Sequence, residues 1–231
     1  MSGTIGVEAM SSRHMRRVPI DFPVSMWLVD LAVEPCAEEM VWLSQAERDR
    51  AARFRVALQR TRYLRLHGAL RLAVAQDYAL PPEDQRYVAA ALGRWRVIAP
   101  IELQLSFSYS GGYGAIALSR DANVGIDIEE WRPVRDADSL AGICFDTDEQ
   151  VMYSLADGRD RDTAFLAGWT RKEAALKAIG TGFQRPPDTL HTGLFGRSAT
   201  QTDAGRIELL SFTTVGLIGA VAAITREQGV R

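Results

Sequence analysis

Two acidic residues at alternate positions of one predicted strand are the first candidates for chemistry. The strand alternates between an apolar face, Val124, Ile126 and Ile128, and a second face that carries Asp127 and Glu129. Two residues of strand rise separate the Cα atoms of the two acids by about 7 Å. Carboxylates this close repel each other, which raises a pKa unless a cation shares the site. A strand whose polar face is simply open to solvent is the alternative interpretation.

A third carboxylate follows on a helix predicted over residues 162–179. Glu173 and Lys177 flank the apolar stripe of this helix, so Glu173 can lie over the strand of Asp127 and Glu129. A simple intrahelical ion pair between Glu173 and Lys177 is the alternative. Three carboxylates completed by water and phosphate oxygens suit Mg²⁺, and the cysteines and histidines lack the spacing of a zinc site. Among metals, the pattern therefore favours magnesium.

Two segments of the chain resemble each other at a constant offset of 105 residues. Leu105–Ala117 and Leu210–Ala222 share seven residue types in register, and both fit two short strands joined by a glycine turn. At nearly the same offset, Leu70-Arg71 of an earlier predicted helix meets Leu176-Lys177. We interpret the chain as an α+β fold with a pseudo-twofold duplication, although chance similarity between Ala-, Gly- and Val-rich strands is an alternative. The two predicted halves are residues 18–119 and 120–231.

Composition and hydropathy limit the class of protein. The 231 residues are 47% apolar, enough to bury a core, and the formal net charge of −2 provides no overall attraction to nucleic acid or to an anionic membrane. The longest apolar run, Val215–Ile224, is too short to span a bilayer, and the first basic residues precede no secretory h-region. We therefore expect a cytoplasmic protein. Residues 1–17 lack periodicity and are expected to be a disordered lead.

One region of the chain is strongly positive. Eight arginines lie between Arg48 and Arg71, opposed there only by Glu47 and Asp49. No helix-turn-helix, zinc or RNP-type aromatic motif accompanies them, which argues against a nucleic-acid partner. They could receive an acidic protein partner or form a solvated helix face. The capping box Ser44-Gln-Ala-Glu47 predicts that a helix begins in this region.

The acidic strand and the later helix together resemble the paired signature of 4'-phosphopantetheinyl transferases. The residues concerned are Val124-Gly-Ile-Asp-Ile-Glu129 and Phe165-Leu-Ala-Gly-Trp-Thr-Arg-Lys-Glu-Ala-Ala-Leu-Lys-Ala-Ile-Gly180. The length and the internal duplication resemble the surfactin-synthetase-activating type, a pseudo-dimer in one chain, over roughly residues 25–225. The resemblance implies transfer of 4'-phosphopantetheine from coenzyme A to a serine of an acyl or peptidyl carrier protein. The product 3',5'-ADP is then released.

The same resemblance implies roles for individual residues. It makes Asp127, Glu129 and Glu173 the ligands of Mg²⁺ and places coenzyme A between the two halves. Glu149 becomes the candidate for the base that deprotonates the serine, although it could also belong to an ordinary acidic helix start. Lys177 becomes the candidate that stabilises or protonates the leaving phosphate.

The resemblance also supplies candidate contacts to coenzyme A. They are Arg50, Arg62, Gly93, Arg94, Ser108, Tyr109 and Lys172. The arginine fork can hold two phosphate oxygens, whereas the stem of Lys172 could instead snorkel out of the core. Tyr109 stands where the family usually has histidine, and Trp95 stands where it usually has proline. Because tyrosine carries no positive charge near pH 7, we expect looser binding of coenzyme A or an altered acyl-coenzyme A preference.

The implied partner is a carrier protein, which is usually acidic in this family, and an internally duplicated chain has less need to dimerise, which favours a monomer. Two alternatives remain. One is a catalytically weakened, transferase-like protein that binds a carrier domain or coenzyme A. The other is a magnesium-dependent phosphohydrolase that uses the same acidic residues.

Overall fold

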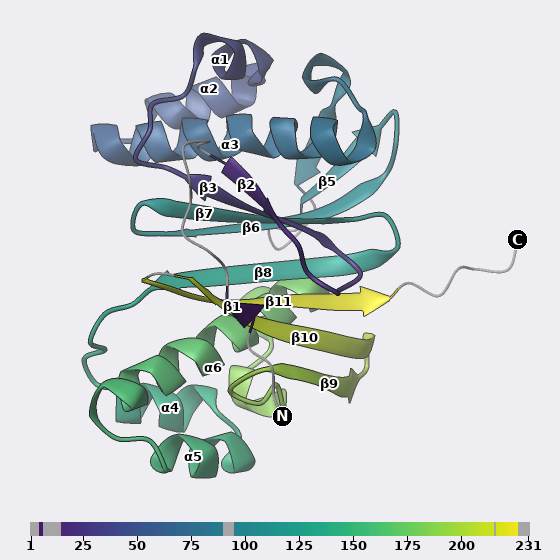
Figure 1. The fold of residues 1–231 in the computed structure, drawn as a ribbon. Coiled ribbons are helices and arrows are strands. Elements are labelled where there is room, and N and C mark those ends of the chain that lie inside the picture. Colours follow the sequence, from purple (N-terminus) through teal and green to yellow (C-terminus); the bar gives the residue numbers. More distant parts are fainter. Residues whose placement is uncertain (1–4, 7–14, 90–94, 215, 226–231) are drawn as a thin grey trace, which may run out of the picture.

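The computed structural model describes residues 5–6, 15–89, 95–214 and 216–225. These residues form two β-sheets with helices on the outer side of each sheet, which confirms the predicted α+β class (Figure 1). We call the sheet and helices of residues 15–119 the first lobe, and those of residues 5–6 and 122–225 the second lobe.

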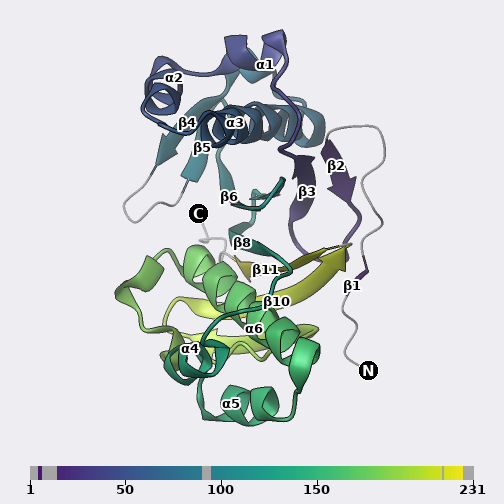
Figure 2. The ribbon, with the colours of Figure 1, turned by 90° about the vertical axis from the view of Figure 1, so that its left-hand side faces the viewer.

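The first lobe has a six-stranded sheet in the order β2-β3-β7-β6-β5-β4. Its strands are β2 (Met15–Val18), β3 (Ser25–Asp30), β4 (Arg86–Ala89), β5 (Trp95–Ala99), β6 (Leu103–Ser110) and β7 (Tyr113–Ser119). Its helices are α1 (Ala37–Trp42), α2 (Gln45–Ala52), α3 (Ala57–Tyr78) and the short 3₁₀ helix η1 (Pro82–Asp84). Helix α3 crosses the outer face of the sheet, and α1 and α2 pack against α3 (Figures 1 and 2).

The second lobe has a five-stranded sheet in the order β1-β10-β11-β8, with β9 also paired to β10. Its strands are β1 (Ile5–Gly6), β8 (Ala122–Glu130), β9 (Arg197–Thr202), β10 (Gly205–Thr214) and β11 (Leu217–Thr225). Its helices are α4 (Ala137–Cys144), α5 (Thr147–Ser154), α6 (Gly158–Ile179) and the 3₁₀ helices η3 (Gly182–Gln184) and η4 (Pro187–Thr189). Helix α6 packs on β8 and β11, and α4 and α5 pack against α6.

The two lobes repeat one arrangement of elements. In the first lobe, β3 is followed by two short helices, a 22-residue helix and strands β4 to β7. In the second lobe, β8 is followed by two short helices, a 22-residue helix and strands β9 to β11. The strand order β3-β7-β6-β5 of the first lobe matches the order β8-β11-β10-β9 of the second. The predicted duplication is therefore confirmed at the level of elements.

The register of the repeated hairpin differs from the predicted one. The strand pairs next to the two hairpin turns lie 104 residues apart rather than 105. A shift of one residue exchanges the two faces of a strand. Leu105 accordingly packs under α3, whereas its predicted counterpart Leu210 packs between the two sheets. The residue that corresponds to Leu105 is Leu209, which packs against α6.

The register of the repeated helix differs as well. Helices α3 and α6 begin 101 residues apart and also end 101 residues apart. Arg71 therefore corresponds to Lys172 and not, as predicted, to Lys177. A helix repeats its apolar face every 3.6 residues, so short Leu-Arg and Leu-Lys matches fit several registers equally well.

Apolar layers hold the lobes together. The layer between the two sheets includes Met26 and Leu28 of the first lobe and Ile126, Ile128 and Phe212 of the second. Full burial of one such side chain contributes about 1.5–3 kcal/mol. Separate apolar clusters lie between each sheet and its long helix. The outer clusters fix α3 and α6 on their own sheets, and the central layer fixes one lobe against the other.

The segment 1–17 was expected to be a disordered lead, yet its described residues belong to strands. Ile5–Gly6 pair in parallel with β10, and Met15–Val18 pair with β3. Residues 1–4 and 7–14 lie outside the described residues. Within the part of the chain that the structure describes, none of the helices combines the length and apolarity needed to cross a membrane.

Candidate active site

A close approach of helix α6 to strand β8 builds the site. A Cβ atom on Gly125 would overlap the carbonyl oxygen of Ala174 and lie 2.6 Å from the amide nitrogen of Ala178. Glycine at this strand position therefore lets the helix backbone lie directly against the strand. Glu173 and Lys177 directly precede these two alanines on the helix. The close contact therefore brings both side chains next to β8, as the sequence predicted.

Asp127 is the most enclosed carboxylate of the site, with 6% of its surface exposed. The Lys177 ammonium lies 2.7 Å from its Oδ1, and the hydroxyl of Ser108 donates to the same oxygen at 2.7 Å. Lys177 also donates to the carbonyl of Ile126 at 3.0 Å. Burial raises the pKa of Asp127, and the positive charge of Lys177 partly offsets that rise.

Glu129 lies two residues further along the strand and is held by two other donors. The hydroxyl of Ser110 donates to Glu129 Oε2 at 2.9 Å, and Arg132 lies 2.7 Å from the same oxygen. The Arg132 side chain is 53% exposed, so this ion pair is screened by solvent. The buried end of the strand thus carries one lysine-bound acid, and the exposed end carries one arginine-bound acid.

Glu173 completes the acidic group from the helix. Burial raises the pKa of Glu173 to about 7, and the charges of Asp127 and Glu129 add to this rise. Its Oε1 atom is buried and has no hydrogen-bond partner among the described residues. The charged form of Glu173 therefore has too few hydrogen bonds and positive neighbours to offset the cost of its burial.

This donor set fits a hard divalent cation. The charges of Asp127 and Glu129 reach Glu173, but the ligand oxygens of the three acids do not all lie within 4.8 Å of one another. Lys177 pairs with Asp127 and Arg132 with Glu129, and the unpartnered oxygen of Glu173 could serve as a ligand. Oxygen-only ligands suit Mg²⁺. Serine and a cation bind Asp127 through Oδ1 and Glu129 through Oε2, so the second oxygen of each carboxylate could serve as a metal ligand while these contacts remain.

Comparison with known proteins identifies the family. Residues 123–216, from the acidic strand through α6 to the last hairpin, match the 4'-phosphopantetheinyl transferase superfamily. The 4'-phosphopantetheinyl transferase HetI of Nostoc sp. is 31% identical over 176 residues, which cover 74% of this chain and 70% of the relative. The chain belongs to the 4'-phosphopantetheinyl transferase superfamily.

Other relatives of this transferase match over a smaller part of their length. A putative 4'-phosphopantetheinyl transferase of Synechocystis sp. is 29% identical over 61% of this chain and 58% of its own length. A 4'-phosphopantetheinyl transferase of Bacillus pumilus is 30% identical over 61% of this chain and 59% of its own length. These names agree with the predicted family and with transfer of phosphopantetheine.

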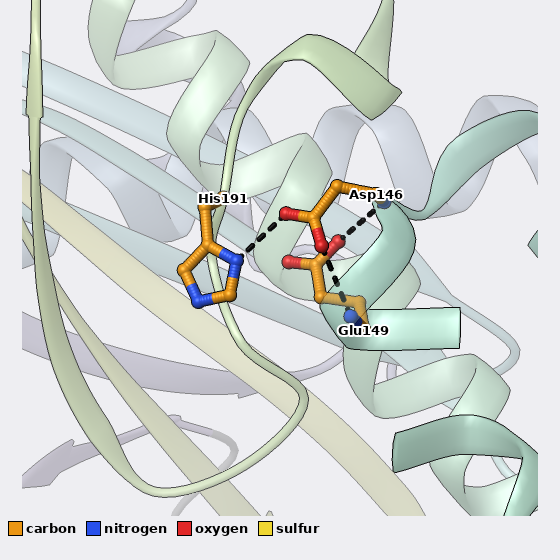
Figure 3. Close-up of side chains that lie close together, drawn as sticks. All are labelled: Asp146, Glu149 and His191. Atoms are coloured by element: carbon orange, nitrogen blue, oxygen red, sulfur yellow. Dashed lines mark hydrogen bonds and ion pairs between the residues drawn. The ribbon is translucent and has the colours of Figure 1, made fainter. Parts of the chain in front are cut away.

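Glu149, predicted to be the base of the transferase, lies in a different environment from the acidic group. It is fully buried and is the third residue of α5, where it forms a capping box with the N-cap residue Asp146 (Figure 3). Glu149 Oε1 accepts from the amide of Thr192 at 2.7 Å and from the amide of Gly193 at 2.9 Å, while Lys172 lies 2.5 Å from Oε2. Both oxygens are therefore engaged by donors within the protein.

Asp146, Glu149 and His191 also bring their ligand atoms within 4.8 Å of one another, which no other trio of described acids, histidines and cysteines does (Figure 3). Asp146 Oδ2 lies 2.7 Å from His191 Nδ1. A cation is already supplied here by Lys172, and the capping hydrogen bonds account for the position of both carboxylates. We therefore explain this cluster by helix capping and ion pairing.

The predicted contacts to coenzyme A are distributed over several places. Arg50 lines a pocket of about 730 Å³ in the first lobe and lies over the ring of Tyr63. Arg62 is half-buried, and Tyr109 is 58% exposed. Gly93 and Arg94 lie outside the described residues. Ser108 contacts Asp127, as described above, and the ammonium of Lys172 is fully buried against Glu149 and the carbonyl of Leu190.

Several contributors were missed by the sequence interpretation. Ser110 and Arg132 bind Glu129, and Ser106 accepts a hydrogen bond from the backbone of Ile126. The alternation of serine at 106, 108 and 110 was a visible signal, since residues two apart in a strand share one face. No comparable signal marked Arg132.

Proposed function

We propose that this transferase moves 4'-phosphopantetheine from coenzyme A to the serine of an acyl or peptidyl carrier protein, as a Mg²⁺-dependent enzyme of the surfactin-synthetase-activating type. The serine oxygen attacks the phosphorus that bears the pantetheine arm. The bond from that phosphorus to the bridging oxygen breaks, and 3',5'-ADP leaves while the serine proton passes to a base. The observation that carries the proposal is the group of Asp127, Glu129 and Glu173 beside Lys177.

Asp127, Glu129 and Glu173 would hold the metal, which when bound supplies positive charge against the pyrophosphate. Phosphoryl transfer depends mainly on positioning and on charge stabilisation, and the described residues offer both. Lys177 contacts Asp127 from the helix, which supports its predicted role at the leaving phosphate beside the same carboxylate. Ser108 and Ser110 donate hydrogen bonds to the first two carboxylates.

The pocket of the first lobe is a candidate site for the nucleotide of coenzyme A. Arg50 and Arg53 supply positive charge, and Tyr63, Tyr87 and Trp95 supply aromatic surface. A guanidinium fork suits phosphate, and an aromatic face suits a nucleobase. Trp95, which departs from the usual family residue, is thus part of the proposed pocket wall. Contacts to the nucleotide remain predictions for Arg62, Gly93, Arg94 and Tyr109.

Glu149 remains a predicted base, but its contacts support a positioning role. A base must reach the proton that it accepts, directly or through one water. Both oxygens of Glu149 accept hydrogen bonds inside the protein, and its side chain has no exposed surface. Lys172 is buried with it and supports the same conclusion, since a phosphate contact would require the Glu149 ion pair to open.

The exposed arginines of the first lobe are a candidate docking surface for the carrier protein. Arg65 and Arg71 are buried in ion pairs, which removes them from the predicted positive surface. The arginines of the segment that remain exposed are Arg48, Arg50, Arg53, Arg55 and Arg60. Val56 and Leu58 lie among them with 52% and 50% exposure. Positive charge around apolar side chains suits an acidic amphipathic helix of a carrier.

Charge reversal tests this surface. Arg55→Glu with Arg60→Glu should raise the KM for the carrier about 5- to 10-fold at low salt, and the effect should shrink at high salt. The KM for coenzyme A should not change. Arg206→Glu, at an exposed position of the second lobe, is the matched control. An equal effect of the control variant would contradict the proposed docking surface.

Mass spectrometry of an apo carrier protein tests the transferase itself. Incubation with coenzyme A, Mg²⁺ and the enzyme should add the mass of phosphopantetheine to the carrier. The gain should disappear with EDTA and in Asp127→Ala. Binding of coenzyme A or carrier without any mass gain on several carriers would favour the weakened binding protein. Release of phosphate from nucleotides without a carrier would favour a phosphohydrolase. A cytoplasmic monomer remains our expectation for the enzyme.

A further inference from the structure

We propose that three alternate serines of β6, Ser106, Ser108 and Ser110, form a ladder through which the first lobe positions the metal-binding carboxylates of the second lobe. This inference rests on the proposed metal site. Ser108 donates to Asp127 Oδ1 at 2.7 Å, and Ser110 donates to Glu129 Oε2 at 2.9 Å. The two acids that line the site on β8 are thus each bound by a residue of the other lobe.

The ladder lies along a sheet edge that has no strand partner. Strand β8 is the last strand of its sheet, so one row of its backbone groups lacks a neighbouring strand. The amide of Ile126 donates to Ser106 Oγ at 3.1 Å, and the amide of Glu130 donates to Ser110 Oγ at 3.0 Å. Serine hydroxyls of β6 therefore accept hydrogen bonds from backbone amides at this edge, and these bonds fix the position of β8 along β6.

The three serines divide these tasks. Ser106 accepts from a backbone amide of β8, whereas Ser108 donates to a carboxylate of β8. Ser110 does both, since it accepts from the Glu130 amide and donates its single proton to Glu129. Because the amide fixes the orientation of the hydroxyl, the proton of Ser110 points at Glu129.

The turn that follows Ser110 makes this end of the ladder rigid. Gly111 has a φ of +56°, and a Cβ atom there would overlap the carboxylate of Glu130. The backbone after Ser110 therefore has the left-handed conformation that favours glycine, and it lies directly against the strand it contacts. Without Ser110, the remaining hydrogen-bond partner of Glu129 among the described residues is Arg132, whose side chain is 53% exposed and also donates to the carbonyl of Glu130 at 3.1 Å.

Binding of Mn²⁺ to the full-length protein, followed by electron paramagnetic resonance of the free ion, tests the inference without turnover. Ser110→Ala should weaken Mn²⁺ binding about 10-fold or more, the range found for residues that orient metal ligands. Ser108→Ala should act in the same direction. Ser110→Thr, which keeps the hydroxyl, should restore affinity to within a few-fold of the wild type.

Ser106→Ala is the matched control. It removes one rung of the same ladder and one hydrogen bond to β8, but it touches neither carboxylate. Its thermal midpoint should fall as in Ser110→Ala, while its Mn²⁺ affinity stays at the wild-type value. Equal Mn²⁺ affinities in wild type, Ser106→Ala and Ser110→Ala would overturn the positioning role alone. A wild-type protein that binds no Mn²⁺ would overturn the proposed metal site, and the ladder's role with it.

Discussion

Each lobe contains an equivalent buried ion pair between a capping-box glutamate and a cation of its long helix. Comparison of the two pairs shows which acids are structural. In the first lobe, the capping-box residue Glu47 is buried and bound by Arg71 at 2.6 Å and by His67 at 2.8 Å. In the second lobe, the capping-box residue Glu149 is buried and bound by Lys172 at 2.5 Å. Both pairs join the second short helix of a lobe to its long helix, at corresponding positions.

The lobes differ at the strand beneath the long helix. Counted from the hairpin turn, Asp127 and Glu129 of β8 occupy the positions of Trp27 and Val29 in β3. Trp27 and Val29 pack in the apolar core under α3. Glu47 and Glu149 therefore serve the frame that both lobes share, whereas Asp127 and Glu129 have apolar counterparts and are the candidates for chemistry.

Breaking the shared ion pairs should have the largest effect on stability. Glu149→Gln and Glu47→Gln should each lower the free energy of unfolding by about 3–5 kcal/mol, because each leaves a buried cation uncompensated. Chemical denaturation of both variants measures this. The contribution of Glu47 to stability also depends on pH. Burial opposes the ionisation of Glu47, but its hydrogen bonds to His67 and Arg71 lower its pKa overall. The ion pair therefore stabilises the fold above pH 4.5, and this stabilisation is lost in more acidic solution.

Activity distinguishes the two roles of Glu149. If Glu149 is structural, the variant should keep most of its kcat per folded molecule at low temperature. A Glu149→Gln protein of normal stability with kcat abolished would instead support its role as the base and would break the correspondence with Glu47.

Replacing Asp127, which has no acidic counterpart in the first lobe, should chiefly affect activity. Asp127→Asn should lower kcat/KM by about 10²–10³-fold, on the scale of losing one main electrostatic contact to a transition state. Holo-carrier formation followed by mass spectrometry measures the loss. Trp27→Phe changes the corresponding position of the first lobe and should leave kcat/KM within a few-fold of the wild type. A comparable loss in Trp27→Phe would show that fold integrity, rather than the carboxylate, limits the reaction.

The close helix approach is a second difference between the lobes. Position 125 is glycine in the second lobe, and the corresponding position of the first lobe is Ser25. Gly125→Ser should cost about 1–3 kcal/mol of stability, because α6 must shift outward to accept the side chain. Activity should fall with it, since Glu173 and Lys177 move away from Asp127.

Gly142→Ala is the control for this substitution. A Cβ atom on Gly142 meets no atom within 4 Å, and alanine favours a helix interior by about 0.5–1 kcal/mol. We expect this variant to be as stable as the wild type or slightly more stable by thermal denaturation. If Gly125→Ser behaves in the same way, the proposed close packing of α6 on β8 is wrong.

The smallest expected effect is a pH dependence that belongs to Glu173. Without divalent metal, the folded protein keeps the Glu173 proton up to about pH 7, whereas the unfolded chain releases it near 4.5. Stability should therefore fall as pH rises from about 5 to 7, by about 1–2 kcal/mol after allowance for partial exposure.

Glu173→Gln should remove that slope when urea denaturation is measured in EDTA at several pH values. The corresponding position of α3 is Leu72, so Leu72→Gln serves as a control that leaves the slope in place. An unchanged slope in Glu173→Gln would assign the pH dependence to another group.

The sequence by itself determined the acidic strand, the long helix and the existence of two similar halves. These follow from short-range periodicities, a period of two for Asp127 and Glu129 and one of 3.6 for the helix of Glu173 and Lys177. Gly125 within the strand also marked a close approach, although only the structure identified the helix as its partner.

The tertiary structure decided the registers and the roles of the polar residues. The predicted offset of 105 aligned similar residue types that lie on opposite faces of their strands. A register shift of one residue still pairs similar apolar residues, but it turns every side chain to the other face of the sheet. Glu149 meets donors from Thr192 and Gly193, more than forty positions away in sequence, and Ser110 meets Glu129 across the lobe interface. Such contacts depend on how separate elements pack, which local sequence patterns do not specify.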